Sequence, residues 1–342
     1  MFQLHVAMGD PQAPLATMLG VLDRHGLRDG SGKLRADVQL VSMGDHFDWG
    51  HPSERKKATD DGYALLAWLS GHSAEQVIIL AGNHDLARVC ELSPFVDDAA
   101  FETAWAMASA AYQAGKPDAE ATRAFLAKYP HVPDAECLAR DFSCYSVEQK
   151  TLVTALLRSQ RLKLAHAHAG LLLCHAGVTE ADFALIGAVP TDAAKAAASL
   201  NGFLEGRVEK WSEGPLELTP LHQAGSLATG VARGVLFHRP AVPNGDWQFR
   251  GPPRRRFDPR EVPSAFPQAV GHIRDKKCRD LLGAWADQDA PVDGVIRSLR
   301  IDGQNVSYAT GAASDARIYF LDCGMNYSAS YELFDLDRRQ PL

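Results

Sequence analysis

Residues 3–14 read QLHVAMGDPQAP, an apolar run that stops abruptly at Gly9 and Asp10 and then turns through a proline. The run has the length and apolar character of a buried β-strand. A glycine followed by a polar residue marks the break after it. The same plan occurs three times in the first quarter of the chain, at residues 4–10, 38–45 and 76–84.

Two intervening segments, residues 15–25 and 61–69, carry apolar residues at roughly helical spacing. Strands that alternate with helices indicate the order β-α-β-α-β and a largely parallel sheet. Ligands of such sheets bind beyond the carboxyl ends of the strands. Since all three glycine-polar breaks fall at that edge, we expect the functional site there.

The rest of the chain divides by composition. Residues 95–165 are rich in alanine and other helix formers and predict a helical insertion that caps the site. Residues 214–267 are rich in proline, glycine and arginine and predict a long loop insertion near the site. Further strands are expected in GLLLCHAGVT, AVGHI, GVIRSLRID, RIYFLDCG and SYELFDLD, and a helix over residues 191–211. With 46% hydrophobic residues, we interpret residues 1–342 as a single domain that carries these two insertions.

Charge and cysteine content narrow the classes of protein. The formal net charge of -7 offers no general attraction to nucleic acid or to an anionic membrane. The apolar runs are far shorter than the ~20 residues of a membrane span, and the amino terminus lacks the pattern of a signal peptide. None of the six cysteines forms a CxxC pair, which favours reduced thiols. We therefore expect a cytoplasmic protein with neither a membrane nor nucleic acid as its partner.

Side chains that bind metals stand at five of the expected strand ends. Each lies in a glycine-containing break, and glycine lets the backbone approach a site closely. Carboxylates, an amide oxygen and imidazoles together suit divalent ions such as Mn²⁺, Fe²⁺ or Zn²⁺, and a shared aspartate could bridge two ions ~3.5–4 Å apart. The residues are Asp10, Asp45, Asn83, His84, His175 and His272. Ordinary turns and helix caps would explain one or two of these residues, but not six in this arrangement.

The motifs that hold these residues are GDPQ, GDHFDWG, GNHD, CHAG and GHI, in that order along the chain. They resemble the calcineurin-like metallophosphoesterases, and most closely the branch that contains protein Ser/Thr phosphatases and symmetrical diadenosine tetraphosphate hydrolases. The pattern of that branch is GDxHG, GDxxDRG, GNHE/D, HAG and GH. The resemblance implies an α/β fold of two packed mixed β-sheets flanked by helices, a four-layer sandwich, with the helical insertion as a cap.

The resemblance also implies a dinuclear metal site, with two Mn²⁺ ions expected and iron or zinc as alternatives. The implied ligands are Asp10, Gln12 and Asp45 for the first ion and Asp45, Asn83, His175 and His272 for the second. His84 would protonate the leaving-group oxygen as a general acid, and Asp48 would orient His84. Metal-bound water would attack phosphorus in line, without a covalent enzyme intermediate.

Two positions depart from the pattern of the family. Gln12 stands where many members have histidine; its amide oxygen is a weaker ligand than imidazole, so the first ion should be held less tightly. Glutamine also occurs at this place in some diadenosine tetraphosphate hydrolases. Trp49 stands where the pattern has an arginine expected to contact the substrate phosphate. Its ring either stacks on a nucleobase or another aromatic group, or packs in the core.

A different cation must then contact the phosphate. Arg239, in the sequence VLFHRP, resembles a second phosphate-contacting arginine of the family and is the preferred candidate. Arg274 and the arginine run 254–256 are the alternatives. Three more residues lie near the motifs: His46, His238 and Asp322. Each either supports the site or has an ordinary role in packing or in a turn.

The leading hypothesis is a metallophosphoesterase, a hydrolase that cleaves a phosphomonoester or a nucleotide-type phosphoanhydride. A small phosphorylated substrate, nucleotides included, is favoured because the insertion could restrict access and because LDCGMNY replaces the SAPNY stretch of eukaryotic protein Ser/Thr phosphatases. The alternatives are a protein Ser/Thr phosphatase, a non-catalytic relative that binds a phosphorylated ligand, and an RNA-end phosphatase or nuclease. The last would use the arginines at 250, 254, 255, 256 and 260. Whether the chain needs an obligate protein partner is open.

Overall fold

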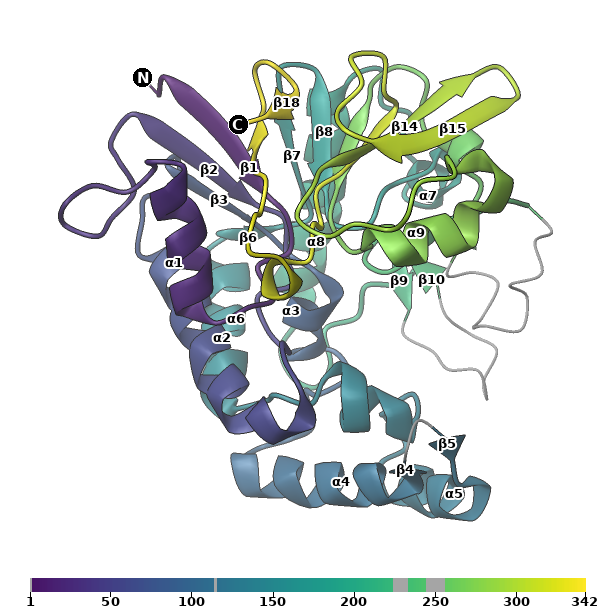
Figure 1. The fold of residues 1–342 in the computed structure, drawn as a ribbon. Coiled ribbons are helices and arrows are strands. Elements are labelled where there is room, and N and C mark those ends of the chain that lie inside the picture. Colours follow the sequence, from purple (N-terminus) through teal and green to yellow (C-terminus); the bar gives the residue numbers. More distant parts are fainter. Residues whose placement is uncertain (1, 114–115, 224–232, 244–255) are drawn as a thin grey trace.

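The computed structural model describes residues 2–113, 116–223, 233–243 and 256–342. Two six-stranded mixed sheets flanked by helices form the body of the molecule (Figure 1). The α/β class predicted from the sequence is therefore confirmed, as is the presence of two mixed sheets. Among the described residues, no helix is long and apolar enough to cross a lipid bilayer.

The first sheet contains the three early strands at its centre. In sheet order its strands are β18 (Gln340–Pro341), β17 (Phe334–Asp335), β1 (Leu4–Met8), β2 (Val38–Ser42), β3 (Val77–Leu80) and β6 (Leu162–Lys163). β1, β2 and β3 are parallel, with Val6 opposite Leu40 and Leu40 opposite Val77. Every residue of β3 is buried, which explains its uninterrupted apolar sequence VIIL. The predicted parallel β-α-β-α-β unit is thus present.

The helices of this unit bury one apolar face each. α1 (Leu15–Arg24) buries Met18, Val21 and Leu22, the spacing of one helical face. α2 (Arg55–Ser70) begins six residues before the predicted start at residue 61. Its first turns carry mostly polar residues that lie at the surface, so apolar spacing did not reveal them.

The second sheet collects strands from the second half of the chain. In sheet order they are β15 (Asn305–Thr310), β14 (Arg297–Asp302), β16 (Ile318–Phe320), β13 (Gln268–Val270), β8 (Leu171–Cys174) and β7 (Ala165–His168). β8, β13 and β16 are parallel neighbours, whereas β7, β14 and β15 run antiparallel to their partners. The motif residues follow the carboxyl ends of the parallel strands in both sheets.

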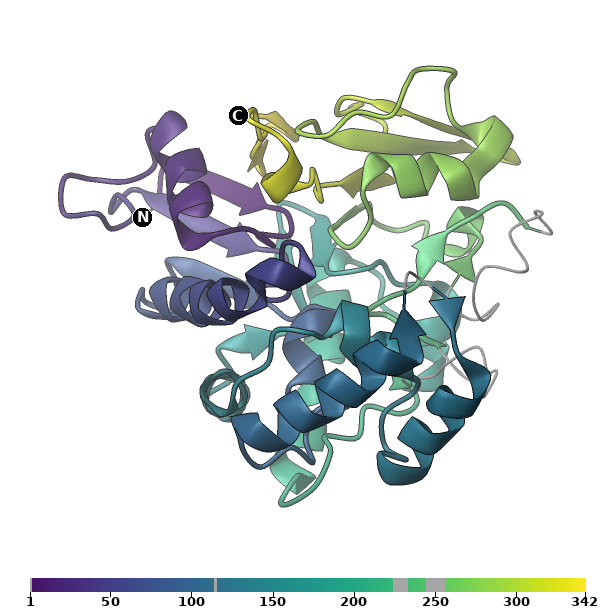
Figure 2. The same ribbon diagram turned by 60° about the horizontal axis from the view of Figure 1, so that its bottom comes forward.

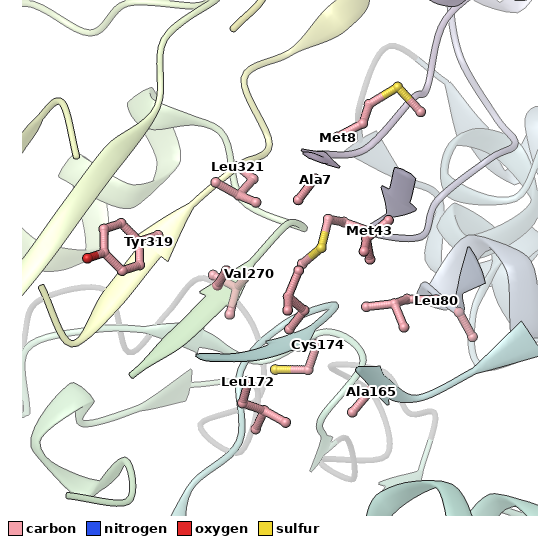
Figure 3. Packing of buried hydrophobic residues seen from close by; sticks show 14 of the residues in the cluster. Ala7, Met8, Met43, Leu80, Ala165, Leu172, Cys174, Val270, Tyr319 and Leu321 are labelled. Carbon is pink, nitrogen blue, oxygen red and sulfur yellow. The ribbon is translucent and has the colours of Figure 1, made fainter. Parts of the chain in front are cut away.

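One hydrophobic cluster contains side chains from both sheets. Figure 3 shows Met43 and Leu80, from the first sheet and the segment after β2, beside Cys174 and Val270 from the second. All four are at most 2% exposed. Because the sheets share this core, movement of one against the other would expose buried apolar surface to water. The shared core therefore fixes the strand ends of the two sheets relative to each other.

The remaining helices of the body cover the sheets from outside. They are α6 (Val147–Arg158), α7 (Glu180–Leu185), α8 (Ala193–Lys210) and α9 (Asp275–Leu282). α8, predicted over residues 191–211, packs on β7 and β8, and α6 packs on α2. All six cysteines are free thiols.

A separate helical unit lies beside the body. It contains α4 (Asp98–Ala111), α5 (Ala119–Lys128) and a short π-helix at Cys137–Asp141, with the two-stranded pair β4 (Tyr112–Gln113) and β5 (Lys116–Pro117) between α4 and α5. These elements pack in a second hydrophobic cluster around Phe101 and Phe125, apart from both sheets (Figure 2). α6 and β6 belong to the body, so this helical unit is shorter than the predicted insertion over residues 95–165.

The predicted loop insertion over residues 214–267 is described only in part. It contains short pairs, β9 (His222–Gln223) with β10 (Arg233–Gly234) and β11 (Arg239–Pro240) with β12 (Arg256–Phe257), and a 3-10 turn at Pro259–Glu261. Arg250, Arg254 and Arg255, candidates for phosphate or RNA contacts, lie outside the described residues.

Candidate metal centre

Strand ends from both sheets bring the predicted ligands together. Asp10 follows β1, Asp45 follows β2 and His175 follows β8 directly. Asn83 and His84 begin α3 (Asn83–Ala87), the short helix after β3, and His272 follows β13. The ligand atoms of Asp45, His175 and His272 lie within 4.8 Å of one another. The predicted convergence of these three side chains is therefore present.

Distances around His175 bring two more predicted ligands into this cluster. His175 Nε2 lies 3.3 Å from Asp45 Oδ2 and 3.3 Å from Asn83 Oδ1. Its Nδ1 lies 3.9 Å from Asp10 Oδ1. Three carboxylate or amide oxygens thus face one imidazole in a buried site.

Left-handed backbone conformations position several of these side chains. Asp45, Asp48 and His272 have φ of 57°, 62° and 64°, a region that non-glycine residues rarely adopt. Each such conformation costs of order 1–3 kcal/mol and persists where surrounding contacts impose it. Here the His272 amide donates to Asp10 Oδ2 at 2.8 Å and the Asp45 amide donates to Asp85 Oδ2 at 2.9 Å.

Two motif glycines leave room for the carboxylates. A Cβ at Gly82 would lie 2.0 Å from Asp45 Oδ1, and a Cβ at Gly271 would lie 2.0 Å from Asp10 Oδ1. Neither contact is possible, so the motifs require glycine here for space rather than only for turn geometry.

The donor set fits divalent cations. Asp10 is 3% exposed, and its Oδ1 has no hydrogen-bond partner among the described residues. A buried carboxylate oxygen without a partner is costly, and a cation would satisfy it. Carboxylate, amide and imidazole ligands in one cluster suit Mn²⁺, Fe²⁺ or Zn²⁺.

Two of the histidines are oriented by backbone carbonyls. His175 Nδ1 lies 2.8 Å from the Met43 carbonyl oxygen, and His272 Nε2 lies 2.9 Å from that of Phe237. A carbonyl can only accept a hydrogen bond, so these nitrogens carry the protons. The lone pairs of His175 Nε2 and His272 Nδ1 remain for a metal, the arrangement found at many metal sites.

The electrostatics of the cluster also favour a cation. Burial, together with the nearby carboxylates of Asp322 and Asp45, raises the pKa of Asp10 well above its usual value. Burial acts to raise the pKa of Asp45 as well, but His175 and His84 outweigh it and lower this pKa overall. Burial and the Arg239 guanidinium lower the pKa of His272 well below its usual value, which leaves a neutral imidazole that can ligate a metal.

His84 lies at the rim of the cluster. Its Nδ1 is 3.0 Å from Asp48 Oδ2, and its Nε2 is 3.9 Å from Asp45 Oδ2. Burial acts to lower the pKa of His84, but the carboxylates of Asp45 and Asp48 outweigh it and raise this pKa. The ring packs edge-on against Phe142, at 5.1 Å between centroids and 83° between planes. These carboxylates therefore favour the protonated form of His84 next to the predicted metal ligands.

Arg88 supports this pair, and the sequence analysis missed it. Its side chain is fully buried and donates from Nη1 to Asp48 Oδ2 at 2.6 Å and to the His84 carbonyl at 2.8 Å. The Cys144 amide, just beyond the helical unit, donates to Asp48 Oδ1 at 2.8 Å. Burial acts to raise the pKa of Asp48, but Arg88 and then His84 outweigh it, so this pKa is lowered. An arginine four residues after His84 was the available signal, because that spacing places both on one helical face.

Asp85 organises the turn that carries Asp45. Its buried carboxylate accepts the amides of Gly82, Asp45 and His46 at 2.8, 2.9 and 3.0 Å. The His46 ring bridges Asp85 Oδ1, 2.9 Å from Nδ1, and Ser42 Oγ, 2.9 Å from Nε2. His46 thus has a supporting role, as one of its two interpretations proposed.

Gln12, predicted to bind the first metal, and Trp49, on the predicted substrate side, have defined surroundings. Gln12 Nε2 donates to the Phe47 carbonyl at 3.0 Å, which leaves Oε1 as the end of the amide that can coordinate an ion. Trp49 is only 4% exposed, with Lys57 Nζ 4.6 Å from the centre of its ring, which agrees with the packing interpretation.

The predicted arginines differ in their surroundings. Arg239 lies close enough to lower the pKa of His272. Arg274 makes a two-point contact with Asp293, at 3.1 and 2.6 Å, and its guanidinium carbon lies 3.8 Å from the centre of the Tyr327 ring. His238, another of the supporting candidates, donates from Nε2 to the Gly177 carbonyl at 2.7 Å.

A scan against protein-family models finds no match for this chain, and a search of curated proteins finds none either. An interpretation of function therefore depends on the motifs and the geometry of the site.

Proposed function

We propose that the chain is a metal-dependent phosphoric ester hydrolase of the calcineurin-like metallophosphoesterase type, with the four-layer sandwich of that family. The observation that carries the proposal is the His84–Asp48 pair, joined at 3.0 Å and placed 3.9 Å from a carboxylate of the buried metal-ligand cluster. A histidine oriented by a carboxylate beside such a cluster suits general acid catalysis.

Two divalent ions would be held by the cluster, with Mn²⁺ expected and iron or zinc as alternatives. The first would take Asp10, Gln12 and Asp45, and the second Asp45, Asn83, His175 and His272. Bound there, such ions supply the acidification of water and the neutralisation of phosphate oxygens that hydrolysis needs.

The protein side chains would handle the proton of the leaving group. In protonated His84, Nδ1–H donates to Asp48 Oδ2, and Nε2–H is left for the leaving-group oxygen. The carboxylates that raise the pKa of His84 favour this protonated form. Arg88 would hold Asp48 in its ionised form and in the orientation that His84 needs.

The substrate would be a small phosphorylated molecule, a phosphomonoester or a nucleotide-type phosphoanhydride. Arg239, whose positive charge helps to lower the pKa of His272, remains the preferred phosphate contact. Arg274 is a weaker candidate because Asp293 already binds it at two points. The buried ring of Trp49 favours its packing role over contact with a nucleobase.

The test compares the wild type with His84→Gln and Asp48→Asn, and with His131→Gln as the control, since His131 is an exposed histidine near the helical unit. Each protein is loaded with Mn²⁺ and given an aryl phosphomonoester, an aryl phosphodiester, a dinucleotide polyphosphate and a phosphopeptide. We expect His84→Gln to lower the rate by 10²–10⁴-fold, the usual share of general acid catalysis, with bound metal and the control unchanged.

The outcomes separate the competing functions. Equal trace rates in the wild type and His84→Gln, with metal bound, would favour a non-catalytic phospho-ligand-binding protein. A preference for the phosphopeptide would favour a protein Ser/Thr phosphatase. Salt-sensitive binding and cleavage of RNA would favour the RNA-end phosphatase or nuclease.

A further inference from the structure

A second group of metal-ligand side chains lies at the other end of β1 from Asp10. His5, His168 and Asp337 each place a ligand atom within 4.8 Å of the other two. The five residues of strand from His5 to Asp10 correspond to roughly 16 Å of extended chain. The group is therefore separate from the proposed catalytic site.

The carboxylate of Asp337 faces both imidazoles. Its Oδ2 is 2.9 Å from His5 Nδ1, and its Oδ1 is 2.8 Å from His168 Nε2. The two rings lie close to each other, with 4.5 Å between centroids and 38° between planes. Hydrogen bonds from His168 and then His5 lower the pKa of Asp337, so the carboxylate is ionised. Two imidazole nitrogens and a carboxylate oxygen thus lie within 4.8 Å of one another.

The backbone holds the three segments in this arrangement. The Leu336 amide donates to the His5 carbonyl at 2.9 Å, and the Asp337 amide donates to Asp335 Oδ1 at 3.0 Å. Arg339, two residues on, donates to the carbonyl of Ala169, next to the end of β7, at 2.7 Å. Figure 1 shows β1, β7 and β18 together at this edge of the molecule. The ligand atoms are therefore largely in position before any ion binds.

A third imidazole, that of His166, lies beside this group. His166 lies two residues before His168 on β7, so both side chains emerge on the same face of the strand. Burial first, and then Lys163 and His168, lower the pKa of His166 to about 4.

We propose that His5, His168 and Asp337 bind one divalent transition-metal ion of the Zn²⁺ class. Two imidazole nitrogens and a carboxylate oxygen make a three-ligand zinc set, with water in the fourth position. At zinc–ligand distances of about 2.0–2.1 Å, the ligands of a tetrahedral ion are about 3.3 Å apart. The distances from Asp337 to His5 Nδ1 and to His168 Nε2, now 2.9 and 2.8 Å, must therefore increase by roughly 0.5 Å as the ion replaces the hydrogen-bonding protons. The ion would fasten the first strand, the edge of the second sheet and the turn between β17 and β18.

The experiment uses the full chain, stripped of metal by a chelator and then titrated with Zn²⁺. Wild type, His168→Gln and Asp337→Asn are compared with the control His131→Gln, and bound zinc is counted after desalting. We expect each site variant to hold one Zn²⁺ per chain fewer than the wild type and the control, with aryl phosphate hydrolysis unchanged. Zn²⁺ should also raise the thermal unfolding temperature of the wild type more than that of either site variant.

Equal zinc content in the wild type and both site variants would overturn the proposal, as would loss of the same ion from His131→Gln. Asp337→Asn keeps the size of an exposed side chain, so it decides the matter if His168→Gln folds poorly. The count is a difference between variants of one protein. It therefore stands or falls independently of how many ions the proposed catalytic site binds.

Discussion

Replacement of Arg88 by methionine tests the support of the proposed acid. Arg88 and Asp48 are both buried, with 2.6 Å between Nη1 and Oδ2. The substitution leaves the Asp48 charge without its strongest partner, and breaking a buried pair in this way costs about 3–5 kcal/mol of unfolding free energy. The arginine also donates to Gln149 Oε1 and to the carbonyls of Cys144 and His84. Those hydrogen bonds are worth about 1 kcal/mol each.

A double-mutant cycle separates the charge from the hydrogen bonds. In an Asp48→Asn background no buried carboxylate is left uncompensated, so Arg88→Met should cost only about 2–3 kcal/mol, the hydrogen-bond part. The double variant should then be more stable than the sum of the single effects predicts, by about the 3–5 kcal/mol that the unpaired charge costs. Because Arg88 and His84 lower the pKa of Asp48, the pair stabilises the fold above the unfolded pKa of about 3.9. That contribution is lost as pH falls through the lower folded pKa.

The assay is urea unfolding at pH 7 in the presence of a chelator. Lys276→Met is the control, because Lys276 forms an ion pair with Asp280 at 3.1 Å but is 74% exposed, and such pairs contribute little. If the proposed hydrolysis is observed in the metal-loaded protein, Arg88→Met should also lower its kcat at least tenfold, with a smaller change in KM. A loss below about 1 kcal/mol, or strictly additive effects in the cycle, would refute the role assigned to Arg88.

Three further results are expected. Gly271→Ala should lower Mn²⁺ affinity with little change in secondary structure, because its Cβ would meet Asp10 Oδ1 at 2.0 Å; unchanged affinity by calorimetry would contradict the tight packing at that motif. Between pH 6.5 and 4 the unfolding free energy of the metal-free wild type should fall by about 1–2 kcal/mol because of His166, and His166→Gln should remove this loss. The loss is smaller than the full pKa shift would give because His166 is partly exposed. The sign follows from a folded pKa of about 4, below the unfolded value, so that the unfolded chain binds more protons in this window; parallel stability curves for the two proteins would count against it. Removal of divalent ions by a chelator should abolish hydrolysis and lower the unfolding temperature, and Mn²⁺ should restore both; full activity without ions would exclude the proposed chemistry.

The parallel unit was predictable from sequence because its strands are mostly buried, and β3 is buried on both faces. Such strands give unbroken apolar runs, as in VIIL of β3, and their ends are marked by glycine. The convergence of His175 and His272 follows from the same rule, since both come after parallel neighbours.

Other features depend on contacts between distant segments. β7 and β15 went unrecognised because their apolar patterns are short or alternate with exposed residues. α6 has the same helix-forming composition as the helical unit, so composition could not show that it packs on α2 instead. The spacing of Arg88 from His84 indicated only that these two lie close together, whereas its contacts with Asp48 and Cys144, 40 and 56 residues away, follow no local pattern.

The contact between Cys144 and Asp48 sets a limit on how the helical unit can vary. The outer helices α4 and α5 have their own core, so their length and sequence can change without disturbing the sheets. Residues 142–144, which connect the helical unit to α6, have no such freedom, because Phe142 contacts His84 and the Cys144 amide donates to Asp48. Changes in the outer helices should therefore leave the environment of His84 the same. Under the proposed function, the surface beside the site would diverge without a new set of reacting groups.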